Sequence, residues 1–362
     1  MTGFWSGRRV FLTGHTGFKG GWLALWLKDL GAELVGYALD PPTTPSFYDV
    51  LGLAAVFARD LRADIGDAEG LAAALREAAP EVVFHLAAQP LVREGHADPL
   101  TTFRSNVMGT VHLLEAVRHC PTVRAVVVVT TDKVYANREW VHPYREPDRL
   151  GGSDPYSASK AAAEGVVTAY RESFFAAGGA SVGLASARAG NVIGGGDWAR
   201  DRLVPDCLRA FARGEAVALR NPKAVRPWQH VLEPLGGYLR LAESLWRTPD
   251  GGFSDAWNFG PGETGDATVG EVAARLAGLW GDDARVRECP EADAPREAGL
   301  LRLDVSKAVH RLGWRPRWDL DRALEKTLEW HRAWLAGRTD MRALSLRQIR
   351  DYASAGPGTD RG

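Results

Sequence analysis

Cysteine is scarce in this chain of 362 residues. The three cysteines, Cys120, Cys207 and Cys289, lie far apart and show no metal-ligand spacing. We therefore expect neither a disulfide framework nor a metal site. The pattern predicts three buried free thiols in a reducing compartment.

Long apolar runs and an excess of one charge are also absent. No run is long enough to span a bilayer, and residues 1–9 lack the apolar core of a signal peptide. The 44 basic and 45 acidic residues leave a net charge of -1, which favours neither nucleic acid nor an anionic membrane as the main partner. We expect a cytoplasmic protein.

Short apolar segments alternate with helical patterns through the first half of the chain. Because these segments are almost continuously apolar, they predict an α/β fold: a Rossmann-like, doubly wound parallel sheet with helices on both faces. The helices are expected near residues 22–30, 68–79, 99–119 and 156–177. The expected strands are Val10–Thr13, Leu34–Ala38, Val56–Asp60, Val82–Leu86, Val123–Thr130 and Val182–Arg188.

Beyond Gly190 the pattern becomes irregular, and glycine, proline and tryptophan become frequent. We predict a dinucleotide-binding domain made mainly of residues 1–189 and a smaller, mixed substrate-binding domain made mainly of residues 190–352. The segment of about 226–255 is expected to return to the larger domain, with a helix beginning at Gln229–Val231. Residues 353–362 are expected to form a flexible tail.

The first strand and first helix are joined by a glycine-rich loop, Thr13-Gly14-His15-Thr16-Gly17-Phe18-Lys19-Gly20. Gly14 suits a tight turn, Gly17 lets the backbone approach a pyrophosphate, and Gly20 allows the helix and strand to pack closely. Thr16, Phe18 and Lys19 complete the loop, whose free N–H groups would face phosphates. The loop predicts a dinucleotide site, and the absence of Gly-Lys-Ser or Gly-Lys-Thr argues against a P-loop.

Three further strand ends carry candidate cofactor residues. Asp40 follows the second strand, where an acid would bind the adenosine ribose and favour NAD over NADP, although a turn before Pro41 is an equal alternative. Asp64 and Ile65 follow the third strand and are candidates for the adenine edge, with a helix N-cap as the alternative. Ala87, Ala88 and Gln89 end the fourth strand, where either a dinucleotide or close packing explains the small side chains.

Catalytic candidates gather at the next strand end and the helix after it. Tyr156 and Lys160 lie four residues apart, on one helix face. The spacing predicts that the ammonium lowers the pKa of the phenol toward neutrality, so that Tyr156 can take a proton from a sugar hydroxyl. Thr131 ends the strand, and Asp132 and Lys133 add an acid and a cation that plain alcohol oxidation does not need.

Together the glycine loop, Leu86-Ala87-Ala88, Thr131 and the Tyr156/Lys160 pair resemble the extended short-chain dehydrogenase/reductase superfamily. Within it, several segments resemble the CDP-glucose 4,6-dehydratases, and the similarity runs from about residue 4 to about residue 352. These segments are residues 13–20, Leu39-Asp40-Pro41-Pro42-Thr43-Thr44-Pro45, Thr131-Asp132-Lys133-Val134-Tyr135, residues 190–198 and residues 226–234.

The resemblance implies a lyase with NAD as an internal redox cofactor and CDP-glucose as substrate. Tyr156 would take the proton of the 4-hydroxyl, and Thr131 would hydrogen-bond the same oxygen. Asp132 would protonate the hydroxyl that leaves C6, for which burial must raise its pKa. Related dTDP-glucose and GDP-mannose dehydratases carry an acid at the position of Lys133, so Lys133 is either a base for C5 or a cation that stabilises the enolate.

The second half supplies candidates for holding the nucleotide sugar. Arginine suits bidentate phosphate recognition, although a single arginine is more often a surface residue. Resemblance also implies a homodimer or homotetramer through the helices near 99–119 and 156–177. We expect His230 to be structural, because the chemistry is already assigned to other residues. The substrate-binding candidates are Asn191, Asp197, Trp198, Arg202, Leu203, Arg220 and Arg226.

Three alternatives stay open at this point. A nucleotide-sugar 4-epimerase of the same superfamily would share the glycine loop and Tyr156/Lys160, but it has no need of Asp132 and Lys133. A 4,6-dehydratase of another nucleotide sugar would keep them all. A silent dinucleotide-binding protein would bind NAD without turnover, which the intact set of Thr131, Tyr156 and Lys160 argues against.

Overall fold

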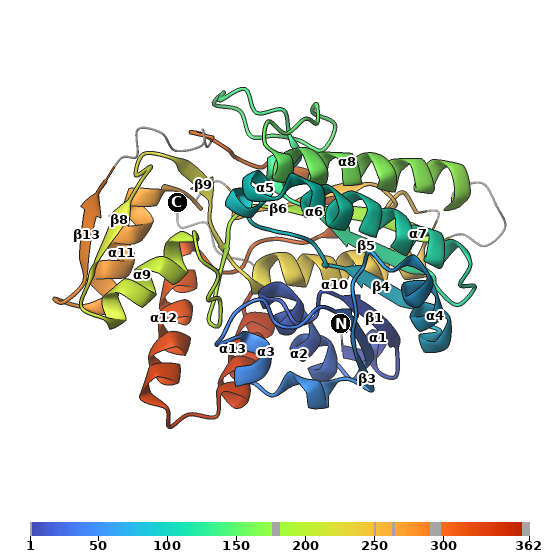
Figure 1. Ribbon diagram of the computed structural model, residues 1–362, viewed down its shortest axis with the longest axis horizontal. Helices are drawn as coiled ribbons and strands as arrows, with labels where there is room; N and C mark the ends of the chain where they lie inside the picture. The colour runs from blue at the N-terminus through green and yellow to red at the C-terminus, as the bar shows by residue number, and fades with distance from the viewer. Residues whose placement is uncertain (1, 176–181, 250, 263–264, 290–297, 357–362) are drawn as a thin grey trace.

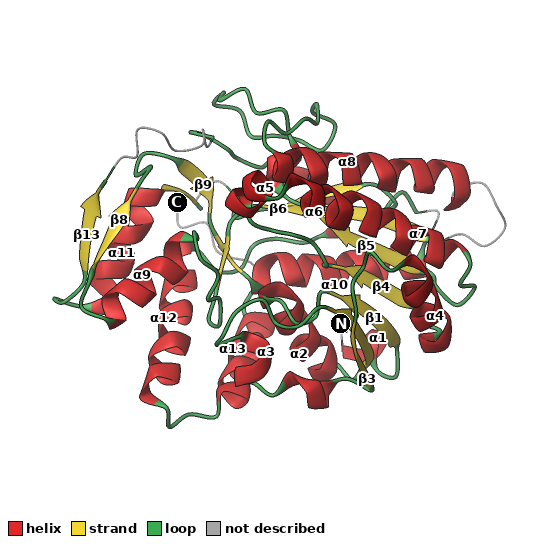
Figure 2. Ribbon diagram, in the orientation of Figure 1, coloured by secondary structure: helices red, strands yellow, loops and turns green. Residues whose placement is uncertain are grey.

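The structure is a computed structural model that describes residues 2–175, 182–249, 251–262, 265–289 and 298–356. Its centre is a seven-stranded, wholly parallel sheet in the order β11-β6-β5-β4-β1-β2-β3 (Figures 1 and 2). The predicted doubly wound α/β fold is confirmed. The strands are β1 (Arg9–Thr13), β2 (Glu33–Ala38), β3 (Arg59–Arg62), β4 (Val82–His85), β5 (Ala125–Val129), β6 (Gly183–Ala189) and β11 (Ala256–Phe259).

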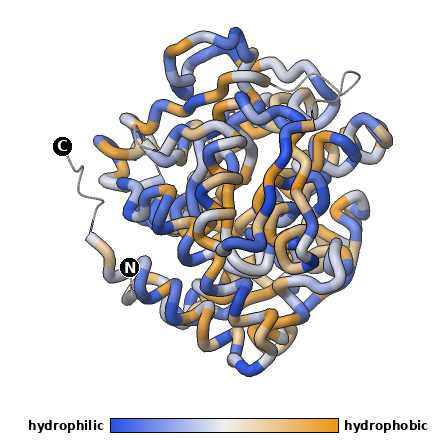
Figure 3. The backbone as a smooth tube through the Cα atoms, turned by 90° about the vertical axis from the view of Figure 1, so that its left-hand side faces the viewer, coloured by the Kyte–Doolittle hydropathy of each residue, from blue (hydrophilic) through white to orange (hydrophobic). Residues whose placement is uncertain are grey.

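Helices cover both faces of this sheet because alternate strand residues point to opposite sides. Val127 of β5 packs in one core with α2 (Phe18–Asp29), α10 (Leu232–Arg247) and α13 (Met341–Ser354). Its neighbours Val126 and Val128 pack in the other core with α4 (Ala68–Ala78), α7 (Gly109–Arg118) and α8 (Pro155–Tyr170). Figure 3 shows the apolar segments running through the middle of the molecule, with hydrophilic ones largely outside.

A smaller lobe follows β6 and has its own apolar core. It contains α9 (Leu203–Ala212), α11 (Val269–Trp280) and α12 (Leu320–Ala336), which share buried side chains such as Leu208, Leu276 and Leu324. Three two-stranded sheets join it: β7 (Val192–Ile193) with β10 (Gln229–His230), β8 (Ala216–Leu219) with β13 (Arg285–Glu288), and β9 (Val225–Pro227) with β12 (Asp266–Thr268).

Short elements complete the connections between the strands and helices. They are α1 (Thr2–Trp5), α3 (Phe47–Val50), α5 (Val92–Ala97), α6 (Pro99–Phe103), η1 (Leu53–Val56), η2 (Arg104–Met108), η3 (Asp132–Val134), η4 (Arg171–Phe175) and η5 (Ala308–Leu312). The elements η2, η4 and η5 are π-helical, whereas η1 and η3 are 3₁₀ turns.

Four sequence-based expectations differ from the structure. Residues 53–56 form a 3₁₀ turn, and the third strand begins only at Arg59. Gln229 and His230 pair with β7 as a strand, so the predicted helix begins later, at Leu232. The π-helical η2 divides the helix expected over 99–119. Strand β11 lies beyond residue 255 and yet joins the main sheet, because its Ala256–Phe259 run is buried beside β6.

The chain ends and cysteines also need correction. Ala353 and Ser354, placed in the tail by the sequence, belong to α13, and residues 357–362 lie outside the described part of the chain. Cys120 and Cys207 are buried free thiols, but Cys289 is exposed because it follows the edge strand β13. Among the described residues, no helix has the length and apolarity required to cross a membrane.

Candidate active site

The candidate catalytic groups meet where β5 ends and α8 begins. Asp154 caps α8 by accepting a hydrogen bond from the Ser157 N–H at 3.0 Å, and Pro155 takes the first helical position. This start places Tyr156 and Lys160, both buried, on the face of α8 that covers the end of β5. The predicted meeting of Thr131, Asp132 and Tyr156 is therefore present in the structure.

Thr131 links the other two groups. Its hydroxyl donates a hydrogen bond to Asp132 Oδ1 at 2.9 Å, and the same side chain acts to lower the pKa of the neighbouring Tyr156 phenol. The same hydroxyl oxygen accepts the Lys133 N–H at 3.4 Å and caps η3. A strand-end threonine alone would not need these partners, so the arrangement favours a role in the site.

The predicted lowering of the Tyr156 pKa by Lys160 is wrong for this structure. Burial raises the pKa of Tyr156 to about 12, while Thr131 and Arg202 act in the opposite direction. Lys160 Nζ instead donates to the backbone oxygen of Val129 at 3.1 Å. Burial also lowers the pKa of Lys160 to about 8, because desolvation disfavours its charged form.

Asp132 has the environment that a carboxylic acid needs to stay protonated. It is buried, and burial raises its pKa against the opposing effects of Lys133, Thr131, Arg226 and Lys19. Its Oδ2 has no hydrogen-bond partner within the described part of the chain. The predicted direction of this pKa shift is confirmed.

Lys19 is a member of this group that the sequence pattern did not place there. It was predicted only as part of the cofactor loop, but its ammonium acts electrostatically on Asp132, Lys160 and Arg202. Burial first, and then the neighbouring cations, lower the pKa of Lys19 to about 7. The glycine spacing could not reveal this, because it describes the backbone and not the direction of a side chain.

The glycine loop has the shape that a bound dinucleotide requires. A Cβ on Gly14, which has a φ of +72°, would lie 2.6 Å from the Ala87 nitrogen, and a Cβ on Gly20 would lie 2.1 Å from the Gly14 oxygen. Gly17 is the N-cap of α2 and makes no side-chain cap, which leaves N–H groups at the helix start for an anion.

Thr16 fixes the loop to β2 by donating to the Leu39 oxygen at 2.9 Å, and Phe18 packs against the apolar core. The residues present fit NAD.

The outer cofactor candidates lie at the same edge of the sheet. Asp40 follows β2, is 88% exposed, and pairs with Arg62 at 3.4 Å. Asp64 accepts from Arg104 at 3.0 Å and from the Gly66 N–H at 2.7 Å. The helix N-cap proposed as its alternative role is wrong, because Asp67 caps α4.

Packing and hydrogen bonds engage the remaining cofactor candidates. Ile65 packs tightly over Gly109, and the Ala87 N–H bonds the Thr13 hydroxyl at 3.2 Å. Ala88 follows directly and is half-buried. The Gln89 side chain donates to Thr102 at 2.8 Å and accepts from the Leu91 N–H. For Gln89, close packing is therefore the better supported of its two predicted roles.

Asn106 is a connecting residue that sequence reasoning missed. Its amide accepts from the Gln89 N–H at 2.8 Å and donates to the Ser159 hydroxyl at 2.8 Å. Ser159 in turn donates to the Tyr156 backbone oxygen at 2.7 Å. Asn106 thus ties the fourth strand end to the catalytic helix, and its place in a π-helical turn has no clear sequence signal.

Two of the predicted substrate residues lie beside the catalytic group. Arg202 pairs with the largely buried Asp197 at 2.9 Å, and its charge acts on both Tyr156 and Lys19. Arg226 is buried in β9, donates to the Val225 oxygen at 2.9 Å, and acts on Asp132.

The other substrate candidates are engaged elsewhere. Arg220 pairs with Asp201 at 3.0 Å. Trp198 packs on Trp334 with ring centres 5.1 Å apart, and Leu203 starts α9 and packs on the core of the smaller lobe. The Asn191 backbone oxygen accepts the Gln229 N–H at 3.1 Å, which ties β7 to β10.

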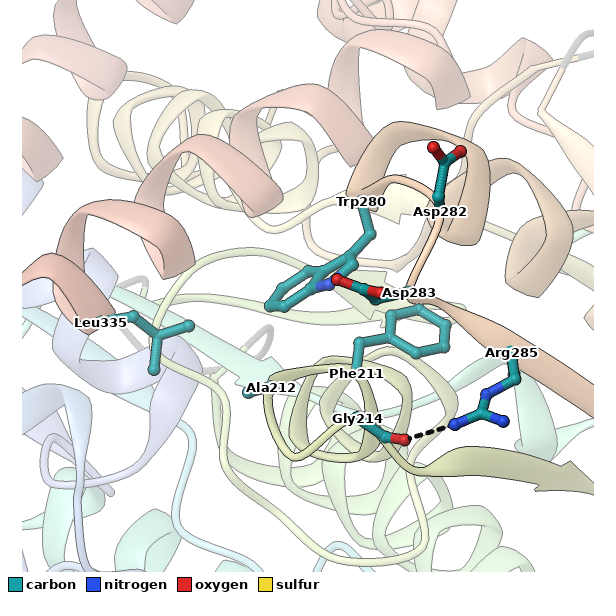
Figure 4. A pocket seen from close by; sticks show the side chains of 8 residues that line it. All are labelled: Phe211, Ala212, Gly214, Trp280, Asp282, Asp283, Arg285 and Leu335. Atoms are coloured by element: carbon teal, nitrogen blue, oxygen red, sulfur yellow. Dashed lines mark hydrogen bonds between the residues drawn. The ribbon is translucent and has the colours of Figure 1, made fainter.

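A separate cavity of about 570 Å³ lies in the smaller lobe and contains none of these groups (Figure 4). Phe211 and Trp280 form its aromatic side, with Asp282, Asp283 and Arg285 at its rim. The sequence predicts no chemistry for these residues. No group of three or more His, Cys, Asp or Glu side chains in the described part of the chain is arranged to hold a metal ion.

Comparison with known proteins identifies the family of this chain. The sequence profile described as GDP-mannose 4,6 dehydratase matches residues 11–327. A CDP-glucose 4,6-dehydratase of Salmonella typhimurium is 52% identical over 355 residues, which cover 97% of this chain and 98% of the relative.

Solved structures show the same fold in enzymes of different names. MoeE5 in complex with UDP-glucose and NAD aligns with a TM-score of 0.74 and 27% identity, over 90% of this chain and 99% of that one. A UDP-glucose-4-epimerase from Stenotrophomonas maltophila aligns with a TM-score of 0.77 and 24% identity, over 91% of this chain and 99% of that one. The fold alone therefore does not separate a dehydratase from an epimerase. From the profile and the curated relative, the chain belongs to the GDP-mannose 4,6 dehydratase family and, within it, to the group of the CDP-glucose 4,6-dehydratases.

Proposed function

We propose that this chain removes water from CDP-glucose to give CDP-4-dehydro-6-deoxyglucose, with NAD as a cofactor that is regenerated in each turnover. The observation that carries the proposal is that Thr131 binds Asp132 Oδ1 at 2.9 Å and also acts on the Tyr156 phenol. It places an acid with a raised pKa beside the group expected to act on the 4-hydroxyl. The 52% identity to a CDP-glucose 4,6-dehydratase supports the substrate.

The cofactor would lie on Gly14, Gly17 and Gly20, with Asp40 at the adenosine end. It supplies the site with an acceptor for the C4 hydride and a donor for C6. The chain itself supplies the groups that take up and donate protons, and a candidate residue can be named for each proton that moves.

Tyr156 takes the proton of the 4-hydroxyl when it is present as phenolate. Burial opposes that state, and Arg202 and Thr131 favour it. An additional positive charge beside the ring would favour the phenolate further, because opposite charges stabilise the ionised form. The resulting 4-ketone makes the C5 proton acidic, which prepares the sugar for elimination.

Asp132 gives its proton to the hydroxyl that leaves C6. The C5 proton must go to a base, and the structure offers two lysines next to Asp132: Lys133, as the family resemblance implies, and Lys19. Burial, which lowers the pKa of Lys19 to about 7, leaves much of it as neutral amine near that pH. A lysine of this pair that stays protonated would not take the C5 proton but would stabilise the enolate as a cation.

The nucleotide diphosphate is expected beside Arg202 and Arg226, with Asn191 as a candidate for the phosphates or sugar and Asp197 as a candidate near the base. The three free thiols fit a reducing compartment, so we place the reaction in the cytoplasm.

The helices expected to form a dimer interface expose apolar side chains. Leu100 is 83% exposed, and Phe103, Met108 and Phe174 are also exposed on or beside α6 and α8. These side chains support a homodimer, with a homotetramer as the larger assembly. Light scattering should show a dimer that Leu100→Asp weakens, and a monomer in the unmodified protein would contradict the interface.

The reaction is tested with CDP-glucose deuterated at C4, beside the dTDP, UDP and GDP analogues. Mass spectrometry and proton NMR should show water loss from CDP-glucose, with deuterium at C6 of the product. Water loss from another analogue alone would overturn the substrate and keep the chemistry. An inverted C4 centre without water loss would favour the epimerase, and unchanged sugars would favour the silent binder.

A further inference from the structure

A buried ion pair lies behind the catalytic residues and has no place in the mechanism above. Glu164 follows Lys160 by one turn of α8, and Arg188 lies near the end of β6. Their contact is bidentate: Arg188 Nε lies 3.0 Å from Oε1, and Nη2 lies 2.8 Å from Oε2. Both side chains are no more than 4% exposed.

Two hydroxyl groups complete the environment of the carboxylate. Thr130 donates to Glu164 Oε1 and Ser186 donates to Oε2, each at 2.6 Å. Burial acts to raise the pKa of Glu164, but Arg188 and these hydroxyls reverse the effect and leave it lowered. Glu164 is thus held as a carboxylate that accepts four hydrogen bonds.

The arginine continues the network away from the helix. Arg188 Nη1 donates to the Tyr135 hydroxyl at 2.9 Å and to the Glu146 backbone oxygen at 3.0 Å. Tyr135 donates to Asn258 Oδ1 at 2.7 Å. The network therefore crosses from α8 over β6 to β11, under the carboxyl edge of the sheet.

Two of the segments that Glu164 joins carry catalytic candidates. Helix α8 carries Tyr156 and Lys160, and Thr130 directly precedes Thr131 and Asp132. Removing the carboxylate would break the hydrogen bond between α8 and Thr130 and would remove a negative charge that acts on Lys160.

We propose that Glu164, held by Arg188, is a positioning residue that fixes the Tyr156 helix against the Thr131 strand end and keeps Lys160 an ammonium. The inference rests on the proposed role of Tyr156 and on the place of Lys160 on the same helix, one turn from Glu164, and adds a residue that supports both. A buried ion pair is weak evidence for stability, since apolar replacements of both partners are often neutral. Replacing both Glu164 and Arg188 by apolar residues is therefore compatible with folding.

Several other titratable and charged groups surround Lys160. On its own helix these are Tyr156 and Glu164. The surrounding elements contribute His85 of β4 and Lys19 of α2, each of which interacts electrostatically with Lys160. Burial lowers the pKa of His85 to about 3, so it is neutral in the working range, and the charge of Lys19 opposes that of Lys160. Glu164 is the acid that raises the pKa of Lys160.

The test compares Glu164→Gln and the double variant Glu164→Leu/Arg188→Met with the unmodified protein. Lys160 is titrated directly by NMR of protein labelled with ¹³Cε-lysine, assigned through Lys160→Arg, and kcat/KM for CDP-glucose is followed against pH. Both the Lys160 titration and the alkaline limb of kcat/KM should move to lower pH, by about one unit. Glu233→Gln, which removes another buried carboxylate away from this network, should move neither.

Thr130→Val keeps the carboxylate and removes one hydrogen bond, so it should leave the Lys160 titration in place. An unmoved Lys160 titration in Glu164→Gln, with kcat/KM reduced equally at every pH, would overturn the proposal. The NMR titration needs no substrate, so a protein inactive on CDP-glucose but with a shifted Lys160 would refute the proposed reaction and not the charge coupling.

Discussion

The hydroxyl of Thr131 donates to Asp132 Oδ1 at 2.9 Å and acts to lower the pKa of the Tyr156 phenol, so one side chain acts on the candidates for both halves of the reaction. Oxidation at C4 needs the phenol, and elimination at C6 needs the acid. Their common partner means that a change in one group alters the electrostatic environment of the other.

Tyr156→Phe removes the phenolic oxygen and leaves the ring to fill its buried position. General acid–base groups contribute roughly 10²–10⁴-fold to rate, so turnover should fall by that order. The glycine loop is untouched, and NAD affinity measured by calorimetry should stay within a few-fold of the unmodified protein. Turnover that is unchanged would remove Tyr156 from the mechanism.

Asp132→Asn tests the acid through pH. Burial raises the folded-state pKa of Asp132 above its usual value of 3.8, so the protonated acid persists to higher pH and is lost as pH rises through that raised pKa. The elimination step should therefore weaken on the alkaline side in the unmodified protein, and Asp132→Asn should abolish water loss at all pH values. Rapid-quench analysis with mass spectrometry should show the 4-ketone accumulating before dehydration. Full dehydration by the Asn variant would contradict the assignment.

Lys133→Met and Lys19→Met distinguish the two candidate bases. The variant that lacks the C5 base should still oxidise C4, seen as absorbance of the reduced nicotinamide, but should not exchange the C5 proton with deuterium from D₂O. We expect this result for Lys133→Met, as the family resemblance implies, with dehydration blocked more than oxidation. The same pattern in Lys19→Met, with exchange intact in Lys133→Met, would transfer the role to Lys19.

Gly20→Ala tests the dinucleotide loop. The new Cβ would lie 2.1 Å from the Gly14 oxygen, and both atoms belong to closely packed backbone that cannot move aside easily. Calorimetry should show NAD binding lost or weakened by at least tenfold, with a lowered Tm. The matched control is Gly278→Ala in α11, where the Cβ meets nothing within 4 Å and should stabilise the helix by about 0.5–1 kcal/mol. Equal NAD affinity in Gly20→Ala would show that the loop does not hold the cofactor.

The sequence by itself determined the parallel sheet, the glycine loop at the first strand–helix turn, and the meeting of Thr131 with Tyr156. These features follow from local rules: the apolar period of strands, the space that a turn leaves, and the four-residue repeat of a helix face. The same rules mislocated Gln229 and His230, because their pairing with β7 depends on a strand distant in sequence.

Only the tertiary structure decided the charges of the site. Asp132 faces Lys19 from α2 and Arg226 from β9, and no spacing in the sequence relates these residues. Burial, and not the neighbouring Lys160, governs the pKa of Tyr156, which reversed the shift predicted from the helix spacing. Desolvation depends on everything packed around a group, so a local pattern can name the catalytic side chains but cannot assign their protonation.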